Sequence, residues 1–268
     1  MGMTDLGDLI EASRFSLRSG TPDLERLYDL AKKRQWNAAE LNWGGLDFSP
    51  LPSELRAGLA DLLAQIHYGE LGALTASARL VQRSPHLVDR LCGATQVADE
   101  ARHVEWFSRL LFHLDTPAPV VPALAAFVDE VVHADDDLAL LVGMNIVVEG
   151  LAQTLMLEAG QVLRAIQIEE LSALRQVGAW LVDRIAHDES RHLAFGMMRT
   201  RQLVEQLDRV QRSRLESQVG QWARLLLKLT AERSEAAVAF GVDGEALMAR
   251  CLADTRLRLK HAGLTLEA

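Results

Sequence analysis

The chain has 268 residues, of which 49% are hydrophobic and 24% charged, and its formal net charge is −9. This is the ordinary composition of a soluble globular protein that can bury a substantial core. The negative charge, with no cluster of Lys or Arg, argues against nucleic acid or an anionic membrane as a partner.

The hydrophobic pattern is helical almost throughout, and glycines and prolines mark the breaks. Thr21-Pro22-Asp23 is typical of a helix N-terminus, and all seven prolines lie at or before Pro122, so we expect the later helices to run without a proline break. A connecting segment is expected over residues 36–52. Helices are predicted over residues 22–33, 53–82, 85–113, 123–133, 136–163, 168–207 and 210–240, with a last one that ends near residue 261.

The predicted helix over residues 136–163 is apolar enough to be mistaken for a membrane span. Its stretch LALLVGMNIVVEGLAQTLML has twenty residues and one charge. Asn145, Glu149 and Gln153 are spaced four residues apart and therefore form one stripe on a helix. A single polar stripe on an apolar helix favours a helix buried in a bundle, with the stripe facing polar groups inside.

The cysteines and the N-terminal stretch both bear on the cellular location of the protein. Cys92 and Cys251 have no CxxC partner, which indicates reduced thiols in a cytosolic protein. The N-terminal stretch MGMTDLGDLIEASRF has acidic residues where a signal peptide needs an apolar run. We therefore expect a cytoplasmic protein, and we expect residues 1–268 to form a single domain.

Four of the predicted helices carry a repeated pattern of carboxylates and histidines. DEARH begins at Asp99, and DESRH begins at Asp188, 89 residues later. In each copy, Glu-x-x-His places a carboxylate and an imidazole on the same face of a helix. A further glutamate lies in the helix before each copy. The candidate ligands are Glu70, Glu100, His103, Glu149, Glu189 and His192.

These residue types predict a centre with two metal ions. Four carboxylates and two imidazoles on four helices can hold two divalent metals with bridging carboxylates. Oxygen and nitrogen donors without thiolates favour iron or manganese over a structural zinc. Without metal, four carboxylates would be hard to bury together. We expect two iron ions, or one manganese and one iron.

The residues beside the ligands predict a supporting layer of hydrogen bonds. A metal-bound imidazole usually donates its second N–H to a carboxylate or a carbonyl. Asp188 could accept from His103 and Asp99 from His192, and Arg102 and Arg191 could pair with these aspartates. Two alternatives stay open: Glu40 competes with Glu70 as the first ligand, and His67 is read as a neighbour of the site rather than a seventh ligand.

The doubled motif, with Glu70 and Glu149 upstream of its copies, resembles the ferritin-like di-iron carboxylate oxidases. This superfamily includes ribonucleotide reductase small subunits, their ligand-binding oxidase relatives, bacterial monooxygenase hydroxylases and di-iron N-oxygenases. The resemblance covers roughly residues 70–196. It implies an all-α fold, with a ferritin-like four-helix bundle over residues 53–205 and additional flanking helices.

The chain departs from each known branch of that superfamily. Phe107 stands where the reductase subunits usually have a radical tyrosine, and Gly72 and Met144 stand where the ligand-binding oxidases would supply a Val–Tyr cross-link. Ile185 replaces the extra histidine of the N-oxygenases, and Gln153 replaces a threonine of the hydroxylases. The motif therefore predicts the metal centre and leaves the substrate open.

We expect an O2-activating non-haem di-iron oxidase or oxygenase that acts on a small, partly apolar organic substrate. Electrons would come from a reductase or a ferredoxin, and we allow for a homodimer. The alternatives are a manganese catalase-like or ferroxidase-type protein, and a helical interaction protein in which the motifs form buried ion pairs. Turn spacing from the ligands predicts a substrate pocket lined by Leu74, Phe107, Val142, Met156, Ala186 and Phe195.

Overall fold

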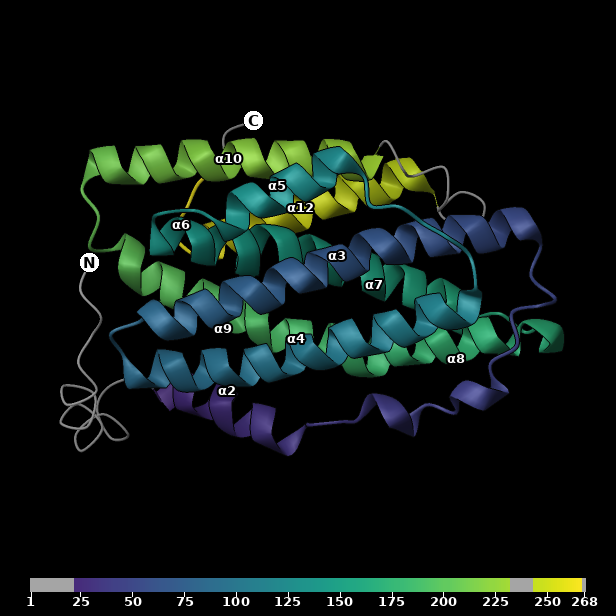
Figure 1. Ribbon diagram of the computed structural model, residues 1–268. Coiled ribbons are helices and arrows are strands. Elements are labelled where there is room, and N and C mark those ends of the chain that lie inside the picture. The colour runs from purple at the N-terminus through teal and green to yellow at the C-terminus, as the bar shows by residue number, and fades with distance from the viewer. Residues whose placement is uncertain (1–21, 232–242, 267–268) are drawn as a thin grey trace.

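The computed structural model describes residues 22–231 and 243–266, and all regular structure in those ranges is helical (Figure 1). The prediction of an all-α fold is confirmed. The long helices are α2 (Pro22–Lys33), α3 (Ser53–Arg83), α4 (Leu87–Leu114), α5 (Pro122–Val132), α6 (Asp137–Leu141), α7 (Glu149–Arg164), α8 (Ser172–Trp180), α9 (Ala186–Val204), α10 (Arg209–Ala231) and α12 (Gly244–His261). Thr21 and residues 232–240 of the predicted elements lie outside the described residues.

A four-helix core is formed by α3, α4 and two composite helices. A short turn joins α3 to α4, so the two run antiparallel and side by side (Figure 1). The composite helices are α6–α7 and α8–α9, and each is continuous through a short π-helical stretch. The helices α5, α10 and α12 cover one side of this core, and α2 lies on the opposite side (Figure 1).

The π-helical stretches were not predicted from the sequence. The first is η3 (Val142–Val148), which ends directly before Glu149, and the second is η5 (Leu181–Ile185), which ends four residues before Glu189. A π-turn shifts the helix face of every residue after it, and such turns are frequent at functional sites. Each of the two composite helices therefore changes register just before it presents a candidate ligand.

The apolar composite helix is covered by the protein itself. Residues Asp137–Arg164 contain a window with a mean hydropathy of 1.6, and 83% of that window is buried. Asn145 and Glu149 are also buried, at 0% and 3% exposure. The helix therefore has the burial expected of a core helix in a bundle.

Two glycines let the composite helices approach closely. A Cβ on Gly178 would lie 2.6 Å from the carbonyl oxygen of Gly160, and a Cβ on Gly160 would lie 3.1 Å from the carbonyl oxygen of Gly178. Real Cβ atoms essentially never lie 2.6 Å from a backbone oxygen, and a distance of 3.1 Å is tight. The crossing of α7 and α8 therefore requires glycine, and it fixes how the two helices that carry Glu149 and Glu189 lie against each other.

The predicted connecting segment over residues 36–52 contains two 3-10 turns, η1 (Ala38–Glu40) and η2 (Trp43–Gly45). Its apolar side chains are buried against α4 and α8, so the segment is part of the core. A third 3-10 turn, η4 (Glu169–Leu171), precedes α8 where the sequence predicted continuous helix.

Candidate metal centre

The structure brings all six candidate ligands to one place inside the four-helix core. Every one of them is at most 5% exposed. Glutamates come singly from α3 and α7, and a Glu-x-x-His pair comes from each of α4 and α9. The cluster consists of Glu70, Glu100, His103, Glu149, Glu189 and His192.

The donor atoms of the cluster fall into two overlapping groups. In each group, one donor atom per residue lies within 4.8 Å of all the others. The groups share Glu100 and Glu189, so these carboxylates are placed to bridge two ions. One group is completed by Glu70 and His103, and the other by Glu149 and His192.

Both imidazoles direct Nδ1 toward the carboxylates. Nδ1 of His103 lies 3.1 Å from Oε2 of Glu70 and 3.1 Å from Oε2 of Glu100. Nδ1 of His192 lies 3.0 Å from Oε1 of Glu100 and 3.4 Å from Oε2 of Glu189. The Nδ1 lone pairs are therefore the ones available to a metal.

The Nε2 atoms of the same imidazoles face aspartates, and the pairing crosses between the motifs. Nε2 of His103 lies 3.4 Å from Oδ2 of Asp188, and Nε2 of His192 lies 3.1 Å from Oδ2 of Asp99. Nε2–H donation to a carboxylate fixes the tautomer with a free lone pair on Nδ1. The aspartates thus orient both imidazoles toward the centre.

Two arginines balance the charge of these aspartates. Arg191 is 6% exposed; its guanidinium donates to Asp99 at 3.0 Å and also to Asp188. Arg102 contacts Asp99 and lies 3.6 Å from Asp188. Charge-assisted bonds of this kind hold buried carboxylates ionised, and the pKa of Asp188 is held well below its usual range despite burial, chiefly by His103 and Arg191.

Trp36 joins this network, although the sequence indicated only that it lies in a connecting segment. Its indole N–H donates to Oδ2 of Asp188 at 2.8 Å, and its ring stacks on His103 with centroids 5.9 Å apart. Trp36 precedes Asp188 by 152 residues, so no local spacing signal exists for the contact. The indole fixes both the aspartate and the imidazole beside it.

Gln96 is a second site residue that the sequence did not single out. Its side-chain amide donates to Oε1 of Glu149 at 2.7 Å and to Oε1 of Glu100 at 3.3 Å. It lies on α4 one turn before Glu100 and is 3% exposed.

Burial shifts the pKa values of the cluster strongly. It raises the pKa of Glu70 to about 8 and the pKa of Glu149 well above its usual value. Burial also opposes charge on both imidazoles, but the carboxylates around them, Glu70 beside His103 and Glu100 beside His192, raise their pKa values well above normal. Without metal, these shifts favour the binding of protons at Glu70, Glu149 and the two imidazoles.

Divalent ions fit this donor set in place of those protons. Both carboxylate oxygens of Glu189 are buried without a hydrogen-bond partner among the described residues. A buried carboxylate that accepts no hydrogen bond is costly unless a cation lies beside it. The set contains oxygen and nitrogen donors only, which suits iron and manganese.

The two alternatives from the sequence are placed outside the cluster. Glu40 is exposed; it caps η1 by accepting from the backbone N–H of Asn37 and lies 3.6 Å from Arg184. His67 lies near the surface, with Nε2 2.9 Å from the hydroxyl of Ser108. Neither residue is in the two donor groups.

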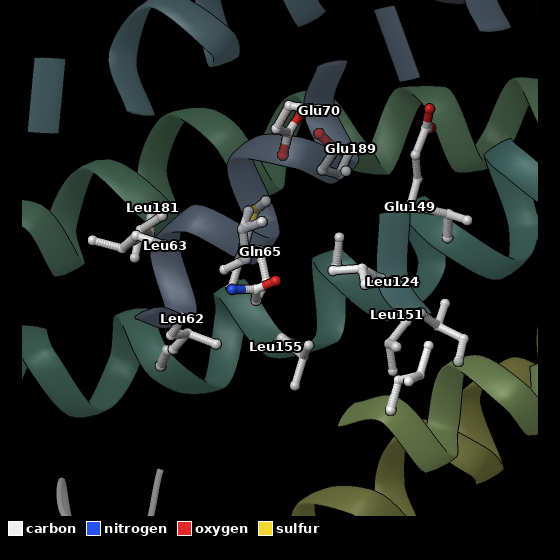
Figure 2. Close-up of a pocket in the computed structure, with 18 of the residues that line it drawn as sticks. Leu62, Leu63, Gln65, Glu70, Leu124, Glu149, Leu151, Leu155, Leu181 and Glu189 are labelled. Carbon is white, nitrogen blue, oxygen red and sulfur yellow. The ribbon is translucent and has the colours of Figure 1, made fainter. Parts of the chain in front are cut away.

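A cavity of about 560 Å³ reaches the cluster from the side of α3 and α7. Glu70, Glu149 and Glu189 form part of its wall (Figure 2). Most of the remaining wall is aliphatic and comes from α3, α5 and α7, with α10 and α12 at one end. The described part of the wall contains no Lys, Arg or His. Apart from the three candidate ligands, its ionisable or amide side chains are Asp61 and Gln65.

Of the six residues predicted to line a substrate pocket, Met156 alone lies in the wall of this cavity. Phe107 and Ala186 are buried in the apolar cluster around Trp106, and Val142 packs in the cluster around Trp222. The other two residues, Leu74 and Phe195, also lie outside the wall, and Phe195 packs with Leu24. Turn spacing places a residue near a ligand along the helix, but it does not reveal which of the neighbouring faces is left unfilled.

Comparisons with known proteins support the fold. No protein-family model matches the chain, and no curated protein matches it. Solved structures do match: a variant of an R2-like ligand-binding oxidase with an anaerobically reconstituted Mn/Fe cofactor has a TM-score of 0.71 at 21% identity. Variants with aerobically reconstituted Mn/Fe and Fe/Fe cofactors each have a TM-score of 0.67 at 20% identity. Each match covers 94% of this chain and 96% of the other. The chain therefore has the ferritin-like fold of these oxidases, as the doubled motif led us to expect.

Proposed function

We propose that this protein is a soluble dimetal oxidase or oxygenase that activates O2 beside an apolar substrate cavity. The main support for the proposal is that the two overlapping donor groups lie directly beside an aliphatic cavity. Three of the four glutamates belong both to the donor groups and to the cavity wall. A substrate in the cavity would lie next to the metals.

The proposed cofactor is a pair of iron ions, or one manganese and one iron. The similar oxidases were reconstituted with both combinations, and this donor set suits either metal. Such a pair supplies the reduction of O2, which amino-acid side chains cannot perform. The protein's own residues hold the ions, orient the imidazoles through Asp99 and Asp188, and keep water away from the reacting atoms.

The proposed substrate is small and largely apolar. The cavity volume of about 560 Å³ is within the usual range of ligand pockets. Transfer of an apolar substrate from water to this aliphatic wall is favourable. We propose an external electron donor, a reductase or a ferredoxin, and a cytoplasmic single-domain protein that can pair as a homodimer.

Two features separate the proposed chemistry from that of the related branches. Phe107 is fully buried and has no hydroxyl, so it cannot store a tyrosyl radical. A methyl group of Met144 lies 3.6 Å from the position of a Cβ on Gly72, so the pair has neither the valine nor the phenol of the Val–Tyr link. Tyr68 bonds to Asp129 at the surface at 3.5 Å. The oxidising power of the centre is therefore proposed to act on a bound substrate.

The test is anaerobic loading with ferrous iron, followed by O2 with and without candidate apolar substrates. We expect O2 consumption, and Mössbauer spectra that change from a ferrous to a coupled ferric pair within the chain. His192→Ala serves as the control and should abolish the coupled signal. Disproportionation of hydrogen peroxide by the manganese form, or continued oxidation of excess iron, would instead establish a catalase or a ferroxidase. If the protein bound no metal, the motifs would instead be interpreted as a network of buried ion pairs.

A further inference from the structure

Two buried amide side chains lie beside the cluster on neighbouring helices. Gln96 is on α4, one turn before Glu100, and Asn145 is on η3, one turn before Glu149. They are 3% and 0% exposed. An amide at such a depth costs free energy unless it is hydrogen-bonded. Both are bonded to each other and to the candidate ligands.

The bonds fix which way the Gln96 amide points. Asn145 Nδ2 donates to Oε1 of Gln96 at 3.0 Å, so the amide nitrogen of Gln96 is directed at the carboxylates. That nitrogen donates to Glu149 at 2.7 Å and to Glu100 at 3.3 Å. If the amide flipped, its oxygen would face two carboxylates and its nitrogen would face the Asn145 amide. The observed orientation gives both ends of the Gln96 amide a complementary partner, while Oδ1 of Asn145 has no hydrogen-bond partner among the described residues.

Packing holds Asn145 in place. A Cβ on Gly196 would lie 2.7 Å from Cβ of Asn145, so α9 reaches this position only because residue 196 is glycine. Asn145 lies within the π-helical stretch η3. Asn145 is therefore a rigid donor toward Gln96.

Glu149 differs from the other three glutamates in what surrounds it. Glu70, Glu100 and Glu189 each lie within 3.2 Å of an imidazole Nδ1, whereas Glu149 lies 3.7 Å from that of His192. Its shortest contact among the described residues is the neutral Gln96 amide. One terminal ligand of the centre is thus positioned by an amide, while the other, Glu70, is positioned by an imidazole.

We propose that Gln96, oriented by Asn145, is a positioning residue for Glu149. The amide holds Oε1 of Glu149, and Oε2, which Asn145 reaches only at 3.5 Å, would serve a metal held together with Glu100, Glu189 and His192. This inference rests on the proposed function, because it assigns a role within that metal centre. It predicts that the two metal positions depend on Gln96 unequally.

The test uses Gln96→Met, which retains side-chain volume and removes the amide. In anaerobic ferrous titrations against a competing chelator, we expect one of the two affinities to fall about tenfold to a hundredfold, as for other groups that orient a ligand. The other affinity should fall much less, because Gln96 reaches the shared Glu100 at Oε1, the oxygen that faces His192. Near-infrared circular dichroism of the diferrous form should show altered bands for one iron only. A purely structural role of the amide would not produce this asymmetry.

A double-mutant cycle tests the order of action. Asn145→Leu frees Gln96 to flip and should weaken the same metal position. If Asn145 acts through Gln96, the double variant should be no worse than Gln96→Met alone. Additive losses would contradict that order.

Gln65→Met is the matched control. Gln65 is another buried glutamine, 8% exposed, in the cavity wall, and it bonds to Asp61 and to backbone groups of Pro119 and Val121 rather than to a candidate metal ligand. The Gln65→Met substitution should lower the melting temperature of the metal-free protein at least as much as Gln96→Met does. It should leave the affinities of both metal positions unchanged. If Gln96→Met lowered the metal affinity of both positions equally, or of neither, this inference would be overturned and the proposed function would stand. A wild type without two bound metals would overturn the proposed function and this inference together.

Discussion

Glu149 is a buried carboxyl group with incomplete charge compensation. Its nearest imidazole is 3.7 Å away, and neutral amides supply its hydrogen bonds among the described residues. Burial raises its pKa well above normal, so the protonated form is favoured in the metal-free protein. A metal ion would replace that proton and ionise the group.

Replacing Glu149 by alanine should therefore affect the metal-bound and metal-free forms differently. Glu149→Ala should lose at least one metal ion and the reactivity toward O2. The metal-free variant should be as stable as the wild type or more stable, because a crowded carboxyl cluster is relieved. Thermal melts of both proteins, with and without ferrous iron, measure this. If Glu149 were half of a buried salt bridge, the metal-free variant would instead lose about 3–5 kcal/mol and bind metal normally.

The aspartates behind the imidazoles should control metal affinity. Asp99→Asn and Asp188→Asn keep the side-chain shape but remove the anion that faces Nε2. We expect each to lower metal affinity by about tenfold to a hundredfold with the fold retained. Metal titrations and far-UV circular dichroism would measure both properties. Asp183→Asn, at an exposed ion pair with Arg164, is the control. Wild-type affinity in both variants would remove these aspartates from the site.

The shifted pKa values predict how the stability of the metal-free protein depends on pH. Glu70 has a pKa raised from 4.5 to about 8, so its native state binds a proton that the unfolded chain releases. Stability from this group is complete below about pH 4.5 and is lost as the pH rises toward 8. The raised pKa values of Glu149, His103 and His192 act in the same direction. The melting temperature should fall from about pH 5 to about pH 8 without metal, and much less with metal bound.

Calorimetry of both forms across that range tests this prediction. The metal-free protein should gain metal affinity as the pH rises, because the ligands must lose protons to bind. A metal-free melting temperature that rises across the window would show that the cluster is not held together by protons.

The candidate ligands could be found from the sequence because residues three apart in a helix always share a face. Glu-x-x-His spacing fixes a shared helix face, and the doubled motif singles out six residues that lie together in the structure. Trp36 and Gln96 could not be found in this way. They reach Asp188 and Glu149 across 152 and 53 residues of chain, and a hydrogen bond between distant helices leaves no periodic signal.

At the scale of helices, the helical hydrophobic pattern and its polar, proline and glycine breaks were enough to predict most boundaries. The helix predicted over residues 53–82 is observed as Ser53–Arg83, and the one over 136–163 as the composite Asp137–Arg164. The π-turns of η3 and η5 were missed because one shifted residue hardly changes a hydrophobic pattern. The cavity face was missed for a different reason: Leu74 and Phe107 lie on α3 and α4, which have no π-turn, and turn spacing does not show which face of a helix is left unfilled.

The close crossing of α7 and α8 predicts that protein stability is sensitive to substitution of Gly178. Gly178→Ala would put a Cβ 2.6 Å from the backbone nitrogen of Arg164 and from the carbonyl oxygen of Gly160. The helices must then separate, at a cost of about 1–3 kcal/mol. Gly69→Ala is the control: a Cβ there meets nothing within 4 Å, so this variant should gain roughly 0.5–1 kcal/mol from helix propensity. Urea unfolding measures both, and equal stability of the two variants would contradict a close crossing.

At the scale of the whole molecule, a two-fold repeat of a helix pair builds the centre. In each repeat, a helix with one glutamate is followed by a helix with Glu-x-x-His, and the shared carboxylates of Glu100 and Glu189 join the two halves. The flanking helices α5, α10 and α12 then cover the side on which the cavity lies (Figure 1). The repeat accounts for the pair of metal positions, and the flanking helices account for an apolar space beside them.

The number of metal ions per chain tests this account most directly. Purified protein would be reconstituted anaerobically with ferrous iron, freed of excess metal and examined by elemental analysis, with circular dichroism to confirm the fold. The two overlapping donor groups predict about two ions per chain in the wild type, and a loss from both positions in Glu100→Ala because that carboxylate is shared. Well under one ion per chain in a folded wild-type protein would contradict the account.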